Sequence, residues 1–466
     1  MISRLYRLSA LFVFCIFSLN AYTQYTITCD FPELAGQYIR LTGFAGFGTY
    51  AIDSAKVSEK GTFVLKYSGD DRGMGYLAAE DDKAYVIVIA GEGIKLKGGL
   101  LSIPESVSIL AGEENLLFDQ YLHEHPIREQ ALSAWIYLRR IYREDPLFND
   151  EKETALAVEK EINKIKNQDH YFLSSLDTRS YISWYLPVRK LVSSVSVIAQ
   201  YRTEEIPGTI EAFRNLDYLD ERLYRSGLLK DVIESHYWLI ENMGKSLDSV
   251  FIEMNISTDR LLSSISSNEA AFNEITKFLF NLLEQRSLFT AAEYLSVKSL
   301  TQNSCTLENN LANQLESYRA MKKGNVVPDI VFSGDVFKNG AAAGTPGRLY
   351  EIESPYKVVI FGASWCPKCA EEFSYIPPLY EKWKSKGVEV VFISLDTDPA
   401  LFKSFTKIFG FISMCDYKKW DTQAAKDYYI FATPTMFLLD KDNRIILRPG
   451  SVRQIDGWID FYSGEK

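Results

Sequence analysis

Glycine is distributed unevenly along this chain, and the unevenness divides the chain into three parts. Of 27 glycines, 13 lie between residues 25 and 112, three between 113 and 323, and 11 from 324 onward. Glycine is disfavoured inside helices and frequent in hairpin turns. A chain of 466 residues is also too long for one core, because domains usually have roughly 100 to 200 residues. We therefore predict a multidomain protein with a β-rich domain at 24–112, a helical domain at 113–323 and a third domain at 324–466.

Residues 1–23 have the pattern of a secretory signal peptide. Arg4 and Arg7 precede an apolar stretch from Leu8 to Leu19, and Ala21 and Thr23 lie where a peptidase would cleave. The apolar stretch is too short to span a bilayer. We expect an exported or periplasmic protein that is soluble after cleavage.

The charge balance is acidic, with 51 Lys and Arg against 61 Asp and Glu and a net charge of −10. No long basic run is present, so nucleic acid is not an expected partner. Signal cleavage would leave five cysteines: Cys29, Cys305, Cys366, Cys369 and Cys415. So few cysteines in a long exported chain do not form a framework of structural disulfides.

Cys366 and Cys369 are the only close cysteine pair in the sequence. Cys29 and Cys305 are better interpreted as isolated, packed thiols than as partners, because free cysteine behaves as a small apolar residue. Cys415 could be a third redox thiol or a buried core residue. The second interpretation is favoured, since nothing near Cys415 in the sequence suggests activation.

The first part alternates short β-like runs with turns, which predicts a small antiparallel β-sandwich. The runs are Tyr38–Leu41, Gly61–Leu65, Ala84–Ile89 and Gly93–Leu96.

The second part carries apolar residues at helical spacing and is predicted to be α-helical. Its helical segments are Asn115–Arg143, Asp150–Lys166, Thr209–Ile240 and, with breaks, Ser267–Tyr318. His123 and His125 are two residues apart and face different sides of a helix, which argues against a shared metal. We interpret both as surface or capping residues.

The third part begins with a loop rich in Gly, Ala, Pro and Asn, and then alternates strands and helices. The loop is Lys322–Arg348, followed by a strand Tyr356–Ala363, a helix Pro367–Lys386, a strand Val388–Leu395, a helix Ala400–Phe409, and strands Thr435–Leu439 and Arg444–Leu447. The last two strands meet across a short turn. This order predicts an α/β sheet with an antiparallel edge hairpin.

The sequence Cys366-Pro367-Lys368-Cys369 lies where the first of these strands gives way to a helix. Residues three apart lie on one helix face, so the two sulfurs can close a small ring with little backbone movement. A helix N-terminus also stabilises a thiolate at the first sulfur. The pair is therefore predicted to be a redox dithiol.

Residues 326–461 resemble the thioredoxin superfamily, and within it the TlpA/ResA-like exported thiol-disulfide oxidoreductases. The matching segments are Val327-Pro328-Asp329, Trp365-Cys366-Pro367-Lys368-Cys369, Glu372-Phe373, Asp396 and Thr433-Pro434-Thr435. The resemblance implies a thioredoxin-like fold and a catalytic disulfide exchanged with protein substrates. It implies neither a cofactor nor a metal.

The resemblance also implies roles for individual residues. Cys366 would attack a substrate disulfide as a thiolate, and Cys369 would resolve the mixed disulfide. Pro434 would be the family's cis-proline and, with Thr433 and Trp365, would bind the substrate. In a separate step, Glu372 would take the proton of Cys369.

Two departures from thioredoxin itself affect the redox chemistry. Ile360 stands where thioredoxin has a buried aspartate, so the role of proton acceptor shifts to Glu372. Pro367 and Lys368 replace the Gly-Pro between the cysteines, and the positive Lys368 should favour the thiolate. We therefore expect a couple that is less reducing than thioredoxin.

Three other interpretations compete with a protein-disulfide reductant. A peroxide reductase would need Thr or Ser at Ala363 and Pro at Val359, and has neither. A zinc site lacks ligands, because one Cys-x-x-Cys supplies two and the C-terminal domain contains no histidine. The third is a partner-binding scaffold in which the thioredoxin-like domain is secondary.

An exported dithiol also needs a membrane or periplasmic thiol reductant. The sequence leaves open the direction of electron flow and the oligomeric state.

Overall fold

The computed structural model describes residues 24–79, 84–148, 150–286, 288–303, 307–344, 346–430 and 432–462. The predicted signal peptide and Cys305 lie outside these described residues. The chain forms two compact units, Met1–Gly244 and Lys245–Lys466. The domain boundaries at residues 112 and 323 stay predictions.

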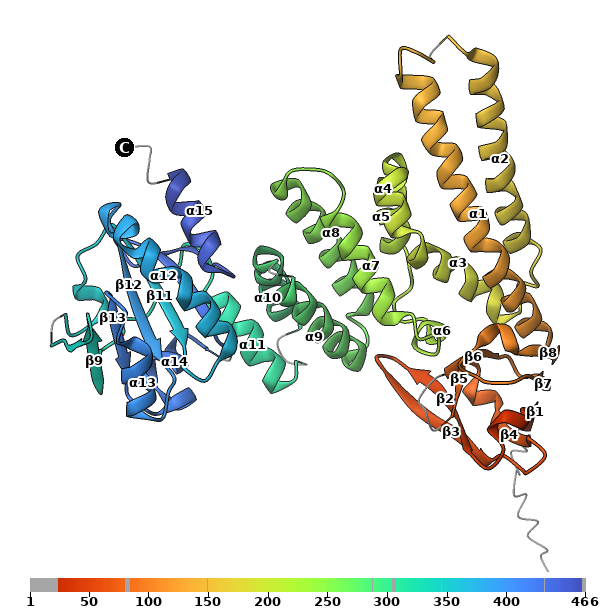
Figure 1. Cartoon of the computed structure of the whole chain (residues 1–466), viewed down its shortest axis with the longest axis horizontal. Coiled ribbons are helices and arrows are strands. Elements are labelled where there is room, and N and C mark those ends of the chain that lie inside the picture. The colour runs from red at the N-terminus through yellow and green to blue at the C-terminus, as the bar shows by residue number, and fades with distance from the viewer. Residues whose placement is uncertain are drawn as a thin grey trace, which may run out of the picture. The chain divides into compact units, whose positions relative to one another are not determined.

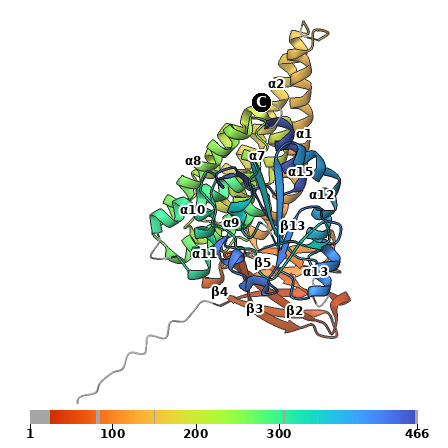
Figure 2. The same ribbon diagram turned by 90° about the vertical axis from the view of Figure 1, so that its left-hand side faces the viewer.

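In the described part of the first unit, strands form two four-stranded sheets with the orders β4-β1-β7-β8 and β3-β2-β5-β6. Figure 2 shows β2, β3 and β4 together at the lower edge of the view. The strands are β1 (Gln24–Asp30), β2 (Tyr38–Ala45), β3 (Gly48–Lys56), β4 (Thr62–Ser68), β5 (Gly73–Ala78), β6 (Ala84–Ile89), β7 (Ile94–Lys97) and β8 (Ser108–Ala111). Ile27 and Leu65 of one sheet share an apolar cluster with Leu41 and Ile87 of the other.

One of these sheets is mixed, so the prediction of a purely antiparallel region is wrong. β1 and β7 run parallel, with Ile27 opposite Ile94. All strands of the other sheet lie between β1 and β7 in sequence. This long connection brings β7 beside β1 in the same direction, which a tight hairpin could not do.

The helices of the first unit follow the strands. They are α1 (Glu113–Glu144), α2 (Lys152–Ser174), α3 (Tyr181–Ser193), α4 (Val195–Tyr201), α5 (Ile206–Arg214), α6 (Glu221–Tyr224) and α7 (Leu229–Glu241). α1 and α2 lie side by side as a long hairpin (Figures 1 and 2). Leu132 and Ile136 of α1 pack there with Val158 and Ile162 of α2.

The single helical segment predicted over Thr209–Ile240 is wrong, because three separate helices occupy it. Gly227 adopts a φ of +74° just before α7, a left-handed conformation that ends helical geometry.

In the described part of the second unit, four more helices precede the sheet. They are α8 (Leu247–Ile265), α9 (Glu269–Gln285), α10 (Phe289–Asn303) and α11 (Asn309–Ala320). None of the helices in the described ranges is long and apolar enough to cross a membrane.

Among the described residues of the second unit, seven strands form a sheet in the order β10-β9-β13-β12-β11-β14-β15. The strands are β9 (Asp335–Lys338), β10 (Ala341–Ala342), β11 (Tyr356–Gly362), β12 (Val388–Ser394), β13 (Ile412–Cys415), β14 (Thr435–Asp440) and β15 (Ile445–Leu447). The associated helices are α12 (Pro367–Ser385), α13 (Pro399–Thr406), α14 (Gln423–Asp427) and α15 (Val452–Tyr462).

β11, β12 and β13 are parallel, while β14 runs antiparallel to β11 and to β15. The α/β sheet with an antiparallel edge hairpin is thus present. The loop predicted over Lys322–Arg348 is wrong in part, because β9 and β10 lie within it. β9 is only four residues long and is defined by its pairing with β13.

Both faces of the inner strand β11 are buried, which explains its continuous apolar sequence. Val358 and Ile360 join an apolar cluster with residues of α12 and α15. Val359 and Phe361 join a second cluster that includes Tyr428, which follows α14. The end of β11 and the start of α12 are therefore held firmly from both sides.

Short 3-10 helices complete the described chain: η1 (Pro32–Leu34), η2 (Gly69–Asp71), η3 (Pro104–Ser106), η4 (Thr203–Glu205), η5 (Leu349–Glu351) and η6 (Lys419–Asp421).

Candidate active site

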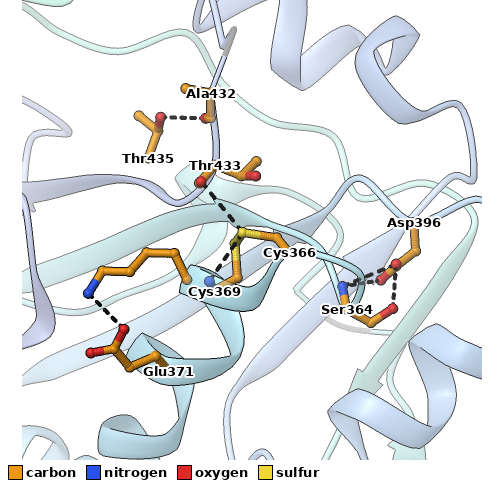
Figure 3. Close-up of a disulfide and its surroundings, with 9 residues drawn as sticks. Ser364, Cys366, Cys369, Glu371, Asp396, Ala432, Thr433 and Thr435 are labelled. Carbon is orange, nitrogen blue, oxygen red and sulfur yellow. Dashed lines mark hydrogen bonds and ion pairs between the residues drawn. A yellow bond between two sulfur atoms is a disulfide. The ribbon is translucent and has the colours of Figure 1, made fainter. Parts of the chain in front are cut away.

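The two cysteines of the predicted dithiol form a disulfide at the start of α12 (Figure 3). Their Cα atoms are 5.2 Å apart. Cys366 is the N-cap residue of the helix, and its Sγ accepts a hydrogen bond of 3.1 Å from the N–H of Cys369. Pro367 occupies the first turn, where its missing N–H costs no helical hydrogen bond.

The two sulfurs differ in their exposure to solvent. The exposed fraction is 6% for Cys366 and 0% for Cys369. Space for the inner sulfur comes from Gly362, since a Cβ there would lie 3.3 Å from Cys369 Sγ. A substrate can therefore reach Cys366 more easily than Cys369.

The loop before β14 faces the outer sulfur. The peptide bond between Thr433 and Pro434 is cis, as the resemblance implies. The carbonyl oxygen of Thr433 lies 3.5 Å from Cys366 Sγ (Figure 3). Thr435 Oγ1 donates to the carbonyl of Ala432 over 2.8 Å and thus closes the loop on itself.

A buried carboxylate fixes the segment that leads into the dithiol. Asp396 is 1% exposed and accepts hydrogen bonds from Ser364 Oγ and Ser394 Oγ, each over 2.7 Å. It also accepts the N–H of Ser364 at 3.1 Å (Figure 3). The sequence match included Asp396 but gave it no role. The sequence signal for such a role was its position just after β12, the strand that pairs with β11.

Glu372 is buried beneath Lys368, at 4% exposure. Its Oε2 accepts the N–H of Val452 at 2.8 Å, at the start of α15. Its Oε1 lies 3.2 Å from Lys368 Nζ, which also lies 2.9 Å from Glu371. The hydrogen bond to Glu371, and to a smaller extent the one to Glu372, raises the pKa of Lys368. The ammonium of Lys368 is therefore balanced by two carboxylates. Sequence reasoning did not foresee the contact between Glu372 and Val452.

Trp365 is 46% exposed and meets a second exposed ring, that of Trp420, edge to face with centroids 6.4 Å apart. Lys419 Nζ lies 5.3 Å from the centroid of the Trp365 ring. Sequence reasoning missed Trp420 and Lys419, because they are fifty or more residues from the dithiol along the chain.

Cys415 packs in the core, as favoured by its sequence context. It is fully buried, and burial raises the pKa of its thiol to about 11. Its Sγ lies 3.3 Å from the carbonyl oxygen of Asp396. Cys29 is likewise a buried free thiol with its pKa raised by burial to about 12.

The interpretation of His125 as a surface or capping residue is wrong, because it is only 8% exposed and its Nδ1 lies 2.9 Å from Asp169. Its partner comes from α2, which the local sequence cannot indicate. His123 is exposed, as expected. Within the described ranges no group of three or more His, Cys, Asp or Glu residues could hold a metal ion.

The match to a protein-family model lies in the C-terminal region. The Redoxin family model matches residues 322–449. The thiol-disulfide oxidoreductase ResA of Bacillus thuringiensis subsp. konkukian is 34% identical over 86 residues, covering 18% of this chain and 49% of the relative. ResA of Bacillus cereus (strain ZK / E33L) is 30% identical over 115 residues, which cover 24% of this chain and 66% of that relative. The chain thus spans about half the length of the curated relatives it matches first.

Solved structures with some similarity include a thioredoxin-like protein from Bacteroides caccae, at 14% identity and a TM-score of 0.40, covering 56% of this chain and 93% of that one. A putative thiol:disulfide interchange protein DsbE from Chlorobium tepidum is 23% identical with a TM-score of 0.26, covering 31% and 98%.

The family match and the curated relatives define the class of the C-terminal region, which is a thioredoxin-superfamily domain. Within that superfamily the domain is of the ResA/TlpA-like kind.

Proposed function

We propose that this chain is an exported thiol-disulfide oxidoreductase that reduces disulfides in protein substrates through Cys366 and Cys369. The observation that supports this most is the position of Cys366 Sγ. It accepts an N–H at the start of α12 and lies 3.5 Å from the Thr433 carbonyl. The helix start favours a thiolate at this sulfur.

The proposed cycle consists of two exchanges. The Cys366 thiolate attacks one substrate sulfur, the substrate disulfide breaks, and the other substrate sulfur leaves as a thiolate. Cys369 then attacks Cys366 Sγ, and the mixed disulfide breaks. The substrate gains two electrons and, after protonation, has two thiols, while the enzyme ends as the Cys366–Cys369 disulfide. A membrane or periplasmic thiol reductant would restore the dithiol.

Glu372 is the proposed acceptor of the Cys369 proton, because it is buried on the same helix one turn further on. Trp365, Thr433 and Pro434 are proposed to hold an extended substrate beside Cys366. Loss of Pro434 would then weaken substrate docking rather than thiol chemistry.

Pro367 and Lys368 are proposed to tune the redox potential. We expect a potential above thioredoxin's, which is about −270 mV. The two carboxylates beside Lys368 will reduce its share of this effect. Equilibration of the protein with glutathione buffers measures the potential, and a value at or below that of thioredoxin would remove this part of the proposal.

The parts before the thioredoxin-like domain are proposed to select substrates or to mediate dimerisation. This proposal includes a β-sandwich at 24–112, a helical domain at 113–323 and a cleaved signal at 1–23. A scaffold in which the dithiol is secondary is not favoured, since the Redoxin family match covers residues 322–449, which include the dithiol.

Insulin reduction tests the proposal. The full chain and its Cys366→Ser variant are compared at the same concentration, with dithiothreitol as the source of electrons. We expect the wild-type chain to accelerate precipitation of the insulin B chain and the variant to match the rate without protein. Equal rates for wild type and variant would refute the enzymatic function.

A further inference from the structure

A cavity of about 540 Å³ lies among the helices of the first unit, separate from the dithiol. Residues of α1, α2 and α3 form its walls, together with residues around α4 and α5. Cavities of roughly 300 to 1,000 Å³ are typical of small-molecule sites. We call it the α1–α3 cavity.

Cationic side chains from several elements line the α1–α3 cavity. They are Arg128 of α1, Lys166 of α2, Lys190 of α3 and Arg202 after α4. The acids in the lining are Glu129, Asp169 and Glu205. Positive charges therefore exceed negative ones by one.

Several buried polar atoms on the lining residues have no hydrogen-bond partner within the described chain. They are Nε and Nη2 of Arg128, Nε of Arg202 and Oγ of Ser194. Arg202 and Ser194 are each 4% exposed. Such burial makes an unmet hydrogen bond costly.

The acids nearby are already engaged. Arg202 Nη2 donates to Glu129 at 2.8 Å, while its Nε lies 3.7 Å from Glu205. Arg128 Nε lies 3.4 Å from Asp169 Oδ1, an ion pair without hydrogen-bond geometry.

Asp169 itself is held by two other side chains. Its Oδ1 lies 2.9 Å from His125 Nδ1, and its Oδ2 accepts from Lys190. Burial alone would raise the pKa of Asp169, but these hydrogen bonds outweigh burial and hold the pKa well below its usual range. Asp169 therefore stays ionised and balances Lys190, and the free guanidinium donors need another acceptor.

We propose that the α1–α3 cavity binds a small molecule that carries an oxyanion, a carboxylate or a phosphate, held by Arg128, Arg202 and Ser194. A guanidinium presents two parallel N–H groups that match the two oxygens of such an anion. Leu132, Ile165 and Leu191 add an apolar wall, which suits a ligand with a short hydrocarbon body.

Calorimetric titration of the full chain tests this, with sodium phosphate, acetate and hexanoate as probes and sodium chloride at equal ionic strength as reference. Saturable binding of phosphate alone assigns the cavity to phosphate-bearing ligands. Saturable binding of the carboxylates alone, with hexanoate tighter than acetate, assigns it to apolar carboxylates. No saturable binding of any probe beyond chloride would overturn the proposal.

Variants locate the binding within the molecule. We expect Arg128→Met to weaken binding by about tenfold or more, since hydrogen bonds to charged groups are lost. Arg140→Met, an exposed arginine on the same helix that does not line this cavity, should leave the affinity unchanged. Equal affinities for wild type and Arg128→Met would overturn the proposal.

Ser194→Ala provides a second test that does not risk the fold. Its hydroxyl has no partner in the described chain, so the variant should keep or raise the thermal midpoint without ligand. With ligand it should bind several-fold more weakly than wild type. Unchanged affinity of Ser194→Ala would contradict the assignment of Ser194 to the binding site. If Arg128→Met also fails to fold, unchanged affinity of Ser194→Ala would overturn the whole proposal. Insulin reduction should be unaffected in both variants.

Discussion

At the scale of single residues, the two isolated thiols are expected to be less reactive than the outer sulfur of the dithiol. Cys415 and Cys29 are buried, with thiol pKa values raised to about 11 and about 12. Because the thiolate is the reactive form, we expect both to resist iodoacetamide at pH 8 in the folded, reduced protein. Cys366 should be alkylated first.

Peptide mass spectrometry after timed quenching measures this order. Urea-unfolded protein, in which Cys29 and Cys415 should react freely, is the control. Alkylation of Cys415 as fast as Cys366 in folded protein would show that Cys415 is an accessible thiol, contrary to its described burial.

Glu372 can be tested separately from its neighbour. Glu372→Gln keeps an oxygen that can accept the N–H of Val452, but removes a group that can take a proton. If Glu372 accepts the Cys369 proton, the variant should resolve the mixed disulfide about 10²-fold or more slowly, at a similar thermal midpoint.

Glu371→Gln is the matched control, since Glu371 is exposed and also pairs with Lys368. Stopped-flow measurement of substrate release from a preformed mixed disulfide gives the rate. Wild-type resolution in Glu372→Gln would leave Glu372 with only a structural role at the start of α15.

Sequence reasoning predicted the contact between neighbouring residues of one helix and missed the contacts between distant residues. Cys366 and Cys369 lie within one helical turn, so their approach follows from helix geometry alone. The contact of Glu372 with Val452 joins residues 80 positions apart, and the burial of His125 depends on Asp169 of another helix. Such partners depend on tertiary packing, which local spacing does not encode.

At the scale of elements, the short strand β9 depends on a tight backbone approach. Gly334, just before it, has a φ of +73°, and a Cβ there would lie 2.2 Å from the carbonyl oxygen of Cys415. Gly334→Ala should therefore destabilise the second unit by more than about 1 kcal/mol.

Gly344→Ala is the control, because nothing lies within 4 Å of a Cβ at that position. Urea unfolding measures both variants. Equal free energies of unfolding for the two would contradict the close approach between Gly334 and β13.

Strands β9 and β13 also show why element prediction failed at this edge of the sheet. Each has only four residues, too few for a periodic pattern to be detected. Each becomes a strand through its partner, since Met414 pairs with Val336. The long runs of β11 and α12, in contrast, carry their own pattern and were predicted.

At the scale of the whole molecule, a buried histidine makes stability depend on pH. Burial lowers the pKa of His236 to about 3 from an ordinary 6.5, and the charge of Arg214 contributes a smaller part of this decrease. Between these values the unfolded chain binds a proton that the folded chain does not. Stability is therefore full above about pH 6.5 and falls by up to about 1.4 kcal/mol per pH unit below it.

Urea unfolding between pH 7 and 4.5 tests this in wild type and His236→Gln. The variant should show a shallower decline with falling pH, whereas His123→Gln, at an exposed position of the same unit, should follow wild type. Parallel curves for wild type and His236→Gln would contradict the lowered pKa.

Composition predicted the general order of the molecule, from β-rich to helical to α/β, but not its grouping into units. Helices α8 to α11 belong to the same compact unit as the thioredoxin-like sheet. Arg448 contributes to this grouping, since its guanidinium carbon lies 4.1 Å from the centroid of the Tyr318 ring of α11. Glycine content cannot indicate such a contact.

The central claim is that Cys366 exchanges disulfides with other proteins and that Cys369 resolves the intermediate. Its most direct test is the Cys369→Ser full chain, incubated with oxidised insulin and analysed by non-reducing mass spectrometry. The account predicts a stable mixed disulfide that maps to Cys366. The double variant that also carries Cys366→Ser should form none. A mixed disulfide of equal yield without Cys366, or none at all, would contradict it.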